Sequence, residues 1–429
     1  MHLAVYLKAV LEAVSPLKLG SGNENISDND VVRDGSGKLY IPGTALAGVT
    51  RHYFEKPYKE KEDFIKYFGC KNTSFNPNCQ SRIIFNDARE LDDDHSIDVT
   101  VRDSVRLNDK KSVVDRGKFD YEIIETGAKF GLRLEFLLEP SEKSNKLGIE
   151  EEKREMAKLK QESDLFFLDF ISAIDSGDIC IGGKTTRGFG KLKVTNPELL
   201  VIDVSKNMND YIAFSWSNKD VWKNAISINK KQNPLERDYI SKTVTLRIST
   251  FLLIRNYATC KIFDSKIVNS EHLKNSQKYS IIPGTSWAGS FQHHCRKILK
   301  KANLPNIDAD TLIFNMFGFP KGKEAQKSKI TFCESVIYGG DTIPRTRTAI
   351  DRFTGSANDK SLFTDAAQYG GECKLTITID KGTEDYKNLI DLCLADLNDG
   401  YMSVGGNTAI GGGIFTITEK GAWESNVTT

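Results

Sequence analysis

An internal repeat is the sequence feature that most constrains how this chain can fold. Residues 41–52 read Ile-Pro-Gly-Thr-Ala-Leu-Ala-Gly-Val-Thr-Arg-His, and residues 282–293 match them at seven of twelve positions without a gap. Two more matches follow in the same order: 81–88 with 328–335, and 181–190 with 404–413. Ordered self-similarity of this kind indicates a duplicated structural unit. The chain is therefore expected to contain two copies of one fold in tandem.

Each copy shows the same order of predicted strands and helices. Alternating apolar residues predict strands at 3–14 and 243–255. Pro-Gly-Thr opens a helix that ends near residue 56 or 301, with Thr44 or Thr285 placed as its cap. The later expected elements are short helical stretches ending at each Phe-Gly, strands at 81–86, 129–138 and 189–195, strands at 328–333, 372–380 and 413–418, and second helices at 149–175 and 384–397. The order β-α-β-β-α-β predicts an α+β fold made of two ferredoxin-like domains.

The length of 429 residues allows two or three domains. We place the first domain at 1–198, a connecting segment at 199–242 and the second domain at 243–429. The connecting segment is polar but contains Trp216 and Trp222, so we expect it to pack on the surface of a domain. The 59 basic and 58 acidic residues leave a net charge of +1. This balance excludes a uniformly basic surface but leaves room for a local basic groove.

The sequence also predicts where the protein resides. No segment has the apolar length that spans a membrane, and the N-terminus does not resemble a signal peptide. The eight cysteines are scattered and form no Cys-x-x-Cys motif, which favours reduced thiols in a cytoplasmic protein. Cys70 and Cys79 flank a polar loop and, with His52, leave a zinc site open as an alternative. Two sulfurs without a second pair are a weak zinc signal.

The segment Gly182-Gly-Lys-Thr185 invites comparison with a nucleotide-binding P-loop. That motif needs a glycine at the position of Asp178, and it runs from strand to loop to helix. Here the predicted order is helix, loop and strand. The sequence therefore does not predict a nucleoside triphosphate site.

A glycine-rich loop can still bind an anion through its backbone N–H groups, and Lys184 and Arg187 would add positive charge. The alternative is a tight helix-to-strand connection that needs positive φ angles. In the second copy, Asn407 and Ile410 stand at the matching positions. This difference predicts that the first loop is the stronger anion binder and that the second keeps the turn.

Together these motifs resemble the RAMP superfamily, specifically the backbone subunits of type III CRISPR effector complexes. The resemblance rests on Ile-Pro-Gly-Thr at the head of a helix, Phe-Gly before a strand, the glycine loop near each domain end, and Arg345-Thr-Arg-Thr-Ala-Ile-Asp-Arg-Phe-Thr-Gly355. It implies a tandem fusion of two such subunits, each with a modified RRM-type fold. The implied partners are guide CRISPR RNA, complementary target RNA and other effector subunits, with no membrane.

The resemblance also implies cleavage of target RNA by an aspartate in the loop before Ile-Pro-Gly. The family pattern is an acidic residue, then a small residue, then a short apolar-rich stretch that leads to Ile-Pro-Gly. In the first copy it places the acidic residue at Asp28, with Asp30 as a close competitor, and in the second copy at Asp264. The second loop is five residues longer between that aspartate and Ile-Pro-Gly. RNA carries its own nucleophile, the 2′-hydroxyl, so a carboxylate needs only to accept a proton or hold a divalent ion. The expected cofactor is a divalent metal ion, Mg²⁺.

The resemblance further implies a β-hairpin thumb in each copy. We place one at 101–106 and 119–122, and the other at 345–347 and 362–364, with 350–355 between its strands. A polar hairpin that carries Lys and Arg side chains near its base is suited to contact phosphates and to insert between nucleobases. The residues expected to bind RNA are Lys18, Arg51, Arg106, Lys184, Arg187, Arg345 and Arg347.

Two alternatives remain open at the level of sequence. The same scaffold could hold guide RNA with one or both cleavage sites silent, and the altered glycine and acidic loops of the second copy favour partial silence there. A metal-independent guide-processing ribonuclease would instead use histidines as acid and base. His52 and His293 match between the copies, but each lies in a predicted helix, where packing is the favoured role.

Overall fold

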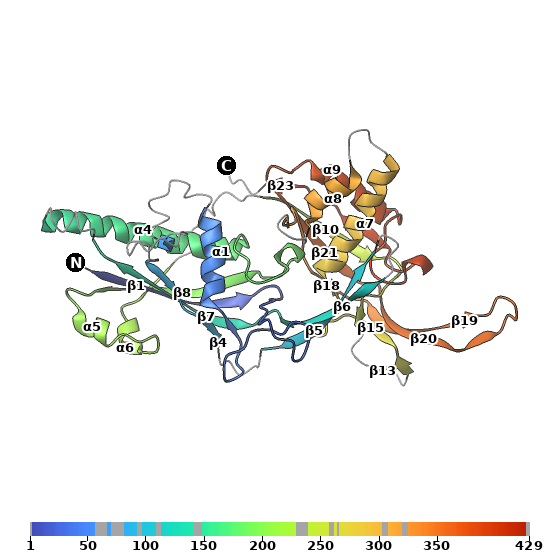
Figure 1. The fold of residues 1–429 in the computed structure, drawn as a ribbon, viewed down its shortest axis with the longest axis horizontal. Helices are drawn as coiled ribbons and strands as arrows, with labels where there is room; N and C mark the ends of the chain where they lie inside the picture. Colours follow the sequence, from blue (N-terminus) through green and yellow to red (C-terminus); the bar gives the residue numbers. More distant parts are fainter. Residues whose placement is uncertain are drawn as a thin grey trace.

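The computed structural model places two sheet-and-helix domains side by side, one from each sequence repeat (Figure 1). It describes residues 2–55, 67–69, 81–91, 97–108, 113–140, 148–228, 239–256, 261–263, 266–302, 308–319 and 325–425. Within these residues, no helix is long and apolar enough to cross a membrane.

The first domain is an antiparallel sheet covered on one face by helices. Its central strand β1 (Leu3–Ala13) lies between β7 (Lys129–Leu138) and β8 (Leu192–Asp203). The flanking strands are β2 (Tyr40–Ile41), β3 (Ile83–Phe85), β4 (Ala88–Glu90) and β9 (Ile226–Ser227), and the helices are α1 (Gly43–Glu55) and α4 (Ile149–Ser176). This strand order confirms the expected ferredoxin-like arrangement.

Both faces of β1 are buried. Leu3, Val5 and Leu7 belong to the core under α1 and α4, whereas Ala4 and Tyr6 point to the other face. The connecting segment covers that other face with α5 (Met208–Ile212), α6 (Lys219–Trp222) and a cluster of aromatic rings. The ring of Tyr6 stacks on Phe214 at a centroid distance of 3.7 Å. The aromatic residues of the segment therefore anchor it to the first sheet, as the sequence predicts.

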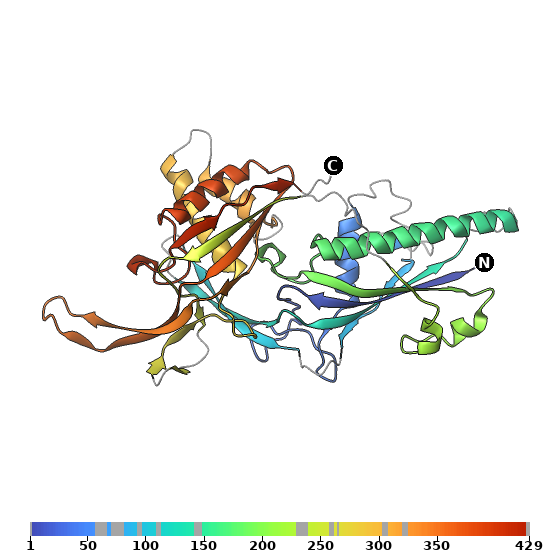
Figure 2. The same cartoon turned by 180° about the vertical axis from the view of Figure 1, so that it is seen from behind.

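The second domain repeats the first (Figure 2). Its central strand β10 (Tyr239–Ile248) lies between β21 (Glu372–Asp380) and β22 (Phe415–Glu419). The other elements of its sheet and helical layer are β16 (Ile281–Ile282), β17 (Ile330–Phe332), β18 (Ser335–Tyr338), β23 (Glu424–Ser425), α7 (Gly284–Ala302), α8 (Ala309–Phe317) and α9 (Tyr386–Asn398). Trp287, Phe291 and Ile390 fill the core between these layers.

Some element boundaries differ from the sequence expectation. Thr44 and Thr285 do not cap their helices, because α1 and α7 already begin at the preceding glycines. The carbonyl of Pro42 accepts the first helical N–H groups, and Asp87 accepts the N–H of Gly43 at 2.7 Å. Strand β8 also runs eight residues beyond the expected end at 195, because its later part pairs with β1. Local sequence patterns did not contain these long-range pairings.

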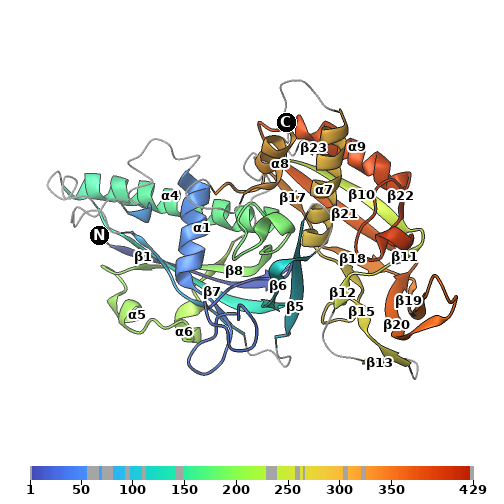
Figure 3. The same cartoon turned by 45° about the vertical axis from the view of Figure 1, so that its right-hand side comes forward.

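The predicted thumbs are β-hairpins inserted at the same place in each domain. The first consists of β5 (Val99–Leu107) and β6 (Val113–Ile124), and the second of β19 (Asp341–Ile350) and β20 (Ala357–Tyr369). The first hairpin lies between the two domains (Figure 3), and the second extends from the molecule as a long arm (Figure 1). The same insertion therefore has two different environments.

The two domains share a buried joint. The glycine loop of the first domain packs on the second, so that a Cβ on Gly188 would meet the Cα of Cys333 at 2.6 Å. A Cβ on Gly284 would meet the carbonyl oxygen of Arg187 at 2.2 Å. Arg102 of β5 is 3% exposed and forms an ion pair with Glu334 across the joint. The first thumb base and the first glycine loop are thus held by the second domain.

Candidate nucleic-acid interface

The loop between β1 and α1 is folded around a buried aspartate. Asp30 is 4% exposed, and its carboxylate accepts the N–H groups of Asn25, Ile26 and Ser27, together with the Ser27 hydroxyl. Burial would raise the pKa of Asp30, but these hydrogen bonds outweigh it and lower the pKa. Asp30 therefore shapes the loop, and its carboxylate is occupied in doing so.

Asp28 has the opposite environment, because its side chain is exposed. The N–H of Asp120 on β6 donates to Asp28 Oδ2 at 2.9 Å, and the N–H of Asp28 donates to Asp120 Oδ1 at 2.8 Å. This reciprocal pair fixes the loop against the thumb strand. Of the two candidate aspartates, Asp28 is the one exposed to solvent beside the thumb.

Two predicted RNA-binding lysines meet over one aromatic ring of the thumb. The ammonium of Lys184 lies 3.3 Å from the ring centroid of Tyr121, and that of Lys18 lies 4.5 Å from the same centroid. The Lys184 ammonium is also 5.4 Å from the ring centroid of Phe119, which is 42% exposed. The result is a cationic cluster on an aromatic base, at the side of the thumb where the glycine loop ends.

The environment of the cluster lowers the pKa of both lysines. The pKa of Lys184 is lowered to about 7. Burial is the larger cause, and three nearby cations add to it: Lys18, Arg102 and Arg187. Burial also lowers the pKa of Lys18 and of Arg187. An anion bound here would relieve both the desolvation and the repulsion.

The other predicted RNA-binding residues of the first domain lie apart from this cluster. Arg51 donates to the carbonyl oxygens of Phe68 and Gly69 at 3.1 and 3.3 Å, so it fastens α1 to the Phe-Gly segment. Arg106 is exposed toward the outer end of β5. The structure thus brings Lys18 and Lys184 together, places Arg187 in the neighbouring joint, and separates Arg51 from them.

The glycine loops have the same backbone in both domains. Lys184 has φ 59° and ψ 27°, and Asn407 has φ 60° and ψ 24°. Each is followed by a short 3₁₀ turn and then a glycine with a φ of 83°, Gly188 or Gly411. Positive φ explains these glycines as turn residues. The copies therefore share the backbone of the loop and differ in side chains, among them Lys184 against Asn407 and Arg187 against Ile410.

Hydrogen bonds define which residues correspond in the two domains. The N–H of Gly183 donates to the carbonyl of Lys18 at 2.8 Å, and the N–H of Gly406 donates to that of Leu253 at 2.7 Å. The N–H of Val32 donates to the carbonyl of Leu19, and in the second domain the N–H of Leu273 donates to that of Ile254. The bridge between Gly20 and Val31 corresponds to the pairing of Arg255 with His272. The bridge between Arg33 and Leu39 corresponds to the one between Lys274 and Ser280. The correspondence therefore runs from 18–20 with 253–255 and, after six additional residues in the second loop, from 31–41 with 272–282. Asp28 and Asn269 each lie three residues before a matched bridge residue, Val31 or His272.

This register places Asn269 at the position of Asp28. The N–H of Thr364 on β20 donates to Asn269 Oδ1 at 2.8 Å, as the N–H of Asp120 donates to Asp28. Both loop side chains are exposed. Asp264, the residue expected from the family pattern, lies outside the described residues, between β13 (Lys261–Phe263) and β14 (Lys266–Val268).

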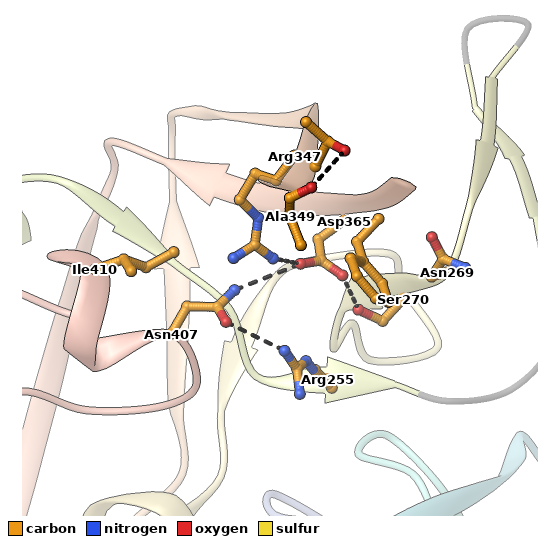
Figure 4. A pocket seen from close by; sticks show the side chains of 10 residues that line it. Arg255, Asn269, Ser270, Arg347, Ala349, Asp365, Asn407 and Ile410 are labelled. Atoms are coloured by element: carbon orange, nitrogen blue, oxygen red, sulfur yellow. Dashed lines mark hydrogen bonds and ion pairs between the residues drawn. The ribbon is translucent and has the colours of Figure 1, made fainter. Parts of the chain in front are cut away.

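The second domain has a cavity of about 580 Å³ where the first has its lysine cluster. It lies between the thumb, β15 (Ser270–His272), β12 (Arg255–Asn256) and the glycine loop (Figure 4). Its polar residues surround Asp365, which pairs with Arg347 and accepts the Ser270 hydroxyl at 2.7 Å.

Asn407 extends this polar network. Its amide contacts Asp365 Oδ2 at 3.4 Å, and its Oδ1 accepts a hydrogen bond from Arg255 at 3.2 Å. Arg345, the remaining predicted RNA-binding residue, lies with its guanidinium 4.4 Å from the ring centroid of Phe251.

Sequence reasoning missed several of these residues. Asp120 and Tyr121 were recognised only as part of a thumb strand, and nothing local marks them. Arg255 stands at the position of Gly20, so it adds a cation that the glycine-loop comparison did not contain. Asn269 did have a signal: it lies thirteen residues before Ile282, as Asp28 lies thirteen residues before Ile41.

The described residues contain no group of three or more His, Cys, Asp or Glu side chains that could hold a metal ion. Cys70 and Cys79 lie outside the described residues, so the zinc alternative stays a prediction. His52 is exposed on α1 and His293 is half-buried on α7.

Comparison with known proteins agrees with the duplicated fold. The model of the RAMP superfamily matches residues 10–193 and again residues 245–416. The chain belongs to the RAMP superfamily.

The two matched regions coincide with the two ferredoxin-like domains, which confirms the tandem fusion of RAMP domains expected from the sequence. The chain is also similar to the CRISPR system Cms endoribonuclease Csm3 of Methanocaldococcus jannaschii. The two are 26% identical over 222 residues, which cover 46% of this chain and 80% of that protein. In this RAMP protein the candidate interface is built at the thumb base of each domain.

Proposed function

We propose that this chain is a backbone subunit of a type III CRISPR effector complex that binds guide RNA and cleaves complementary target RNA from its first domain. Membership of the RAMP superfamily and similarity to a protein named as a CRISPR endoribonuclease support this proposal. The observation that carries it is the exposed Asp28, held by the backbone of thumb strand β6. The same strand carries the ring on which Lys18 and Lys184 meet.

RNA binding follows from the composition of the thumb base. Lys18 and Lys184 neutralise backbone phosphates, and the exposed ring of Phe119 offers a face on which a nucleobase stacks. The second thumb presents Phe353, which is 98% exposed, at the turn between its strands. Exposed apolar side chains on a polar hairpin suit insertion between bases of a guide–target duplex.

Cleavage requires little more than a base and a distorted strand. The Asp28 carboxylate accepts the proton of a ribose 2′-hydroxyl, and that oxygen bonds to the adjacent phosphorus. The bond from phosphorus to the 5′ oxygen breaks, and water protonates the leaving oxygen. A positioned carboxylate contributes roughly 10²–10⁴-fold to such a step. Lys184 stabilises the negative charge that grows on the phosphate oxygens.

The residues present also suit a divalent cation. Asp28 and Asp120 contribute carboxylates on facing segments, and each accepts the other's backbone N–H. Mg²⁺ commonly takes one or two protein carboxylates and completes its shell with water and substrate phosphate, so this donor set fits it. When bound, the ion would neutralise charge on the scissile phosphate. Asp28 is the residue we expect to hold it, with Asp120 beside it.

The test uses the assembled complex with its guide and an end-labelled complementary RNA. Asp28→Ala should remove one product boundary without a large change in target affinity, because a loop carboxylate opposes an anionic strand. Asp30→Ala, by contrast, should lower stability by unfolding the loop. Chelation of divalent ions should stop the cut if Asp28 works through a bound ion, and should leave it unchanged if Asp28 acts as the base alone. If every boundary survives in both Asp28→Ala and the Asp28/Asp30 double variant, cleavage by the first domain is excluded and the scaffold alternative holds.

A further inference from the structure

We infer that the second domain binds RNA at its thumb base but does not cut it, because Asn269 occupies the position of Asp28. This inference rests on the proposed function of Asp28. Its first support is geometric, since both side chains accept the N–H of the matching thumb residue and both lie thirteen residues before Ile-Pro-Gly. The register between the domains is continuous from this position to Ile-Pro-Gly, and the six additional residues of the second loop lie before it.

The second support is chemical. A carboxylamide oxygen accepts hydrogen bonds, which is how Asn269 holds Thr364. The amide is not a base at neutral pH, however, so it cannot take the proton of a 2′-hydroxyl. It is also uncharged and offers a divalent cation one neutral oxygen in place of a carboxylate. Asn269 therefore preserves the loop architecture while removing the reactive group.

The third support is that the surrounding site remains suited to binding. Asn269 lines the cavity of about 580 Å³, together with Arg255 and Arg347. Figure 4 shows Arg255 and Arg347 on either side of Asn407 and Asp365. Asp365 is paired to Arg347, and no carboxylate in the described part of the chain forms an ion pair with Arg255, so its charge is suited to a ribose-phosphate backbone. The second site lacks the cleaving group and has Leu253 and Asn407 where the first has Lys18 and Lys184, but it has cations of its own in Arg255 and Arg347.

The experiment converts the second site into the first. In the assembled complex, Asn269→Asp should create a new product boundary, with a gain in cleavage at that position of about 10²-fold or more. The variant should fold as the parent does, because Asp28 shows that an aspartate accepts the same thumb N–H. Asn269→Ala is the matched control and should create no new boundary. The Asp28→Ala/Asn269→Asp double variant should cut only at the new boundary.

Each result decides between the two proposals. No new boundary in an Asn269→Asp complex that melts and binds target as the parent does would overturn the inference about Asn269. So would a wild-type boundary that disappears in Asp264→Ala, since the second domain would then already cut from its other loop residue. Both outcomes leave the cleavage role of Asp28 standing. A complex in which every boundary survives both Asp28→Ala and the Asp28/Asp30 double change refutes the proposed function instead.

Discussion

The bases of the two thumbs hold the same residue type in different environments. Arg102 in the first thumb is 3% exposed and lies between Glu125 and Glu334, the second of which comes from the other domain. Its counterpart Arg345 is half-buried over the ring of Phe251. The second domain therefore buries Arg102 in the joint between the domains, whereas Arg345 stays partly exposed. Duplication preserved the position, and tandem packing changed its role.

The charges of the two sites differ in a related way. The first site gathers Lys18 and Lys184 on one ring, and their mutual repulsion contributes to the low pKa of Lys184. The second site replaces that lysine by Asn407 and places a carboxylate, Asp365, among its arginines. A comparison of the glycine loops alone predicts a weak second site, whereas the structure supplies Arg255 from another strand. In a duplicated site, a cation that one copy places on a loop can be supplied in the other copy by a residue of a neighbouring strand.

The largest expected difference concerns the two thumb arginines. Arg102→Ala leaves Glu125 and Glu334 buried without their cation, and breaking a buried ion pair costs about 3–5 kcal/mol. Arg345→Ala removes a cation–ring contact worth about 1 kcal/mol. Urea unfolding of the whole chain, followed by tryptophan fluorescence, measures both. Equal shifts of the transition midpoint would show that the joint adds nothing to the first thumb base.

A smaller difference is expected in RNA affinity. Lys184→Ala should weaken binding of single-stranded RNA several-fold and reduce the slope of log affinity against log salt by about 0.7–1, as for loss of one phosphate contact. Asn407→Ala is the matched change in the second loop and should leave the slope unaltered. Fluorescence anisotropy over a salt series measures both slopes. Equal reductions would contradict the stronger anion binding assigned to the first loop.

The smallest effect is a dependence of RNA affinity on pH. In the free chain Lys184 loses its proton around pH 7. A bound phosphate favours the charged ammonium and raises this pKa, so binding takes up a proton above pH 7. Affinity should therefore fall as the pH rises from 7 to 9, by no more than the Lys184→Ala loss. Lys184→Arg, whose guanidinium stays charged, should give a flat profile; a sloping one would assign the effect to another group.

The sequence predicted the repeated order of elements because each motif reflects a local requirement. Strands at 129–138 and 372–380 alternate with period two, and the structure has strands at those residues. Helix α4 was expected at 149–175 and spans Ile149–Ser176. The hairpin character of both thumbs followed from the family resemblance. Helix starts were less accurate, because the caps at α1 and α7 depend on backbone and side-chain partners elsewhere in the chain.

Some residues of the candidate site could likewise be identified from sequence motifs, whereas others required the structure. Asp28, Lys18 and Lys184 could be named in advance because they lie in or beside recognisable motifs. Asn269 was available from its spacing to Ile-Pro-Gly, but an acidic pattern five residues earlier drew the expectation to Asp264. Hydrogen-bond register resolves such a choice of equivalent position, since it compares backbone positions directly and does not depend on residue type.

The sequence by itself therefore determined the duplication, the topology and the loops that carry the candidate residues, since these depend on periodicity and on glycines that tolerate positive φ. Only the tertiary structure decided the electrostatics. Arg102 and Glu334 are 232 residues apart in the chain, and the low pKa of Lys184 arises from burial and from cations on other segments. Coulomb energies depend on distance and on the surrounding dielectric, and both are set only when the first domain has folded and the second has packed against it.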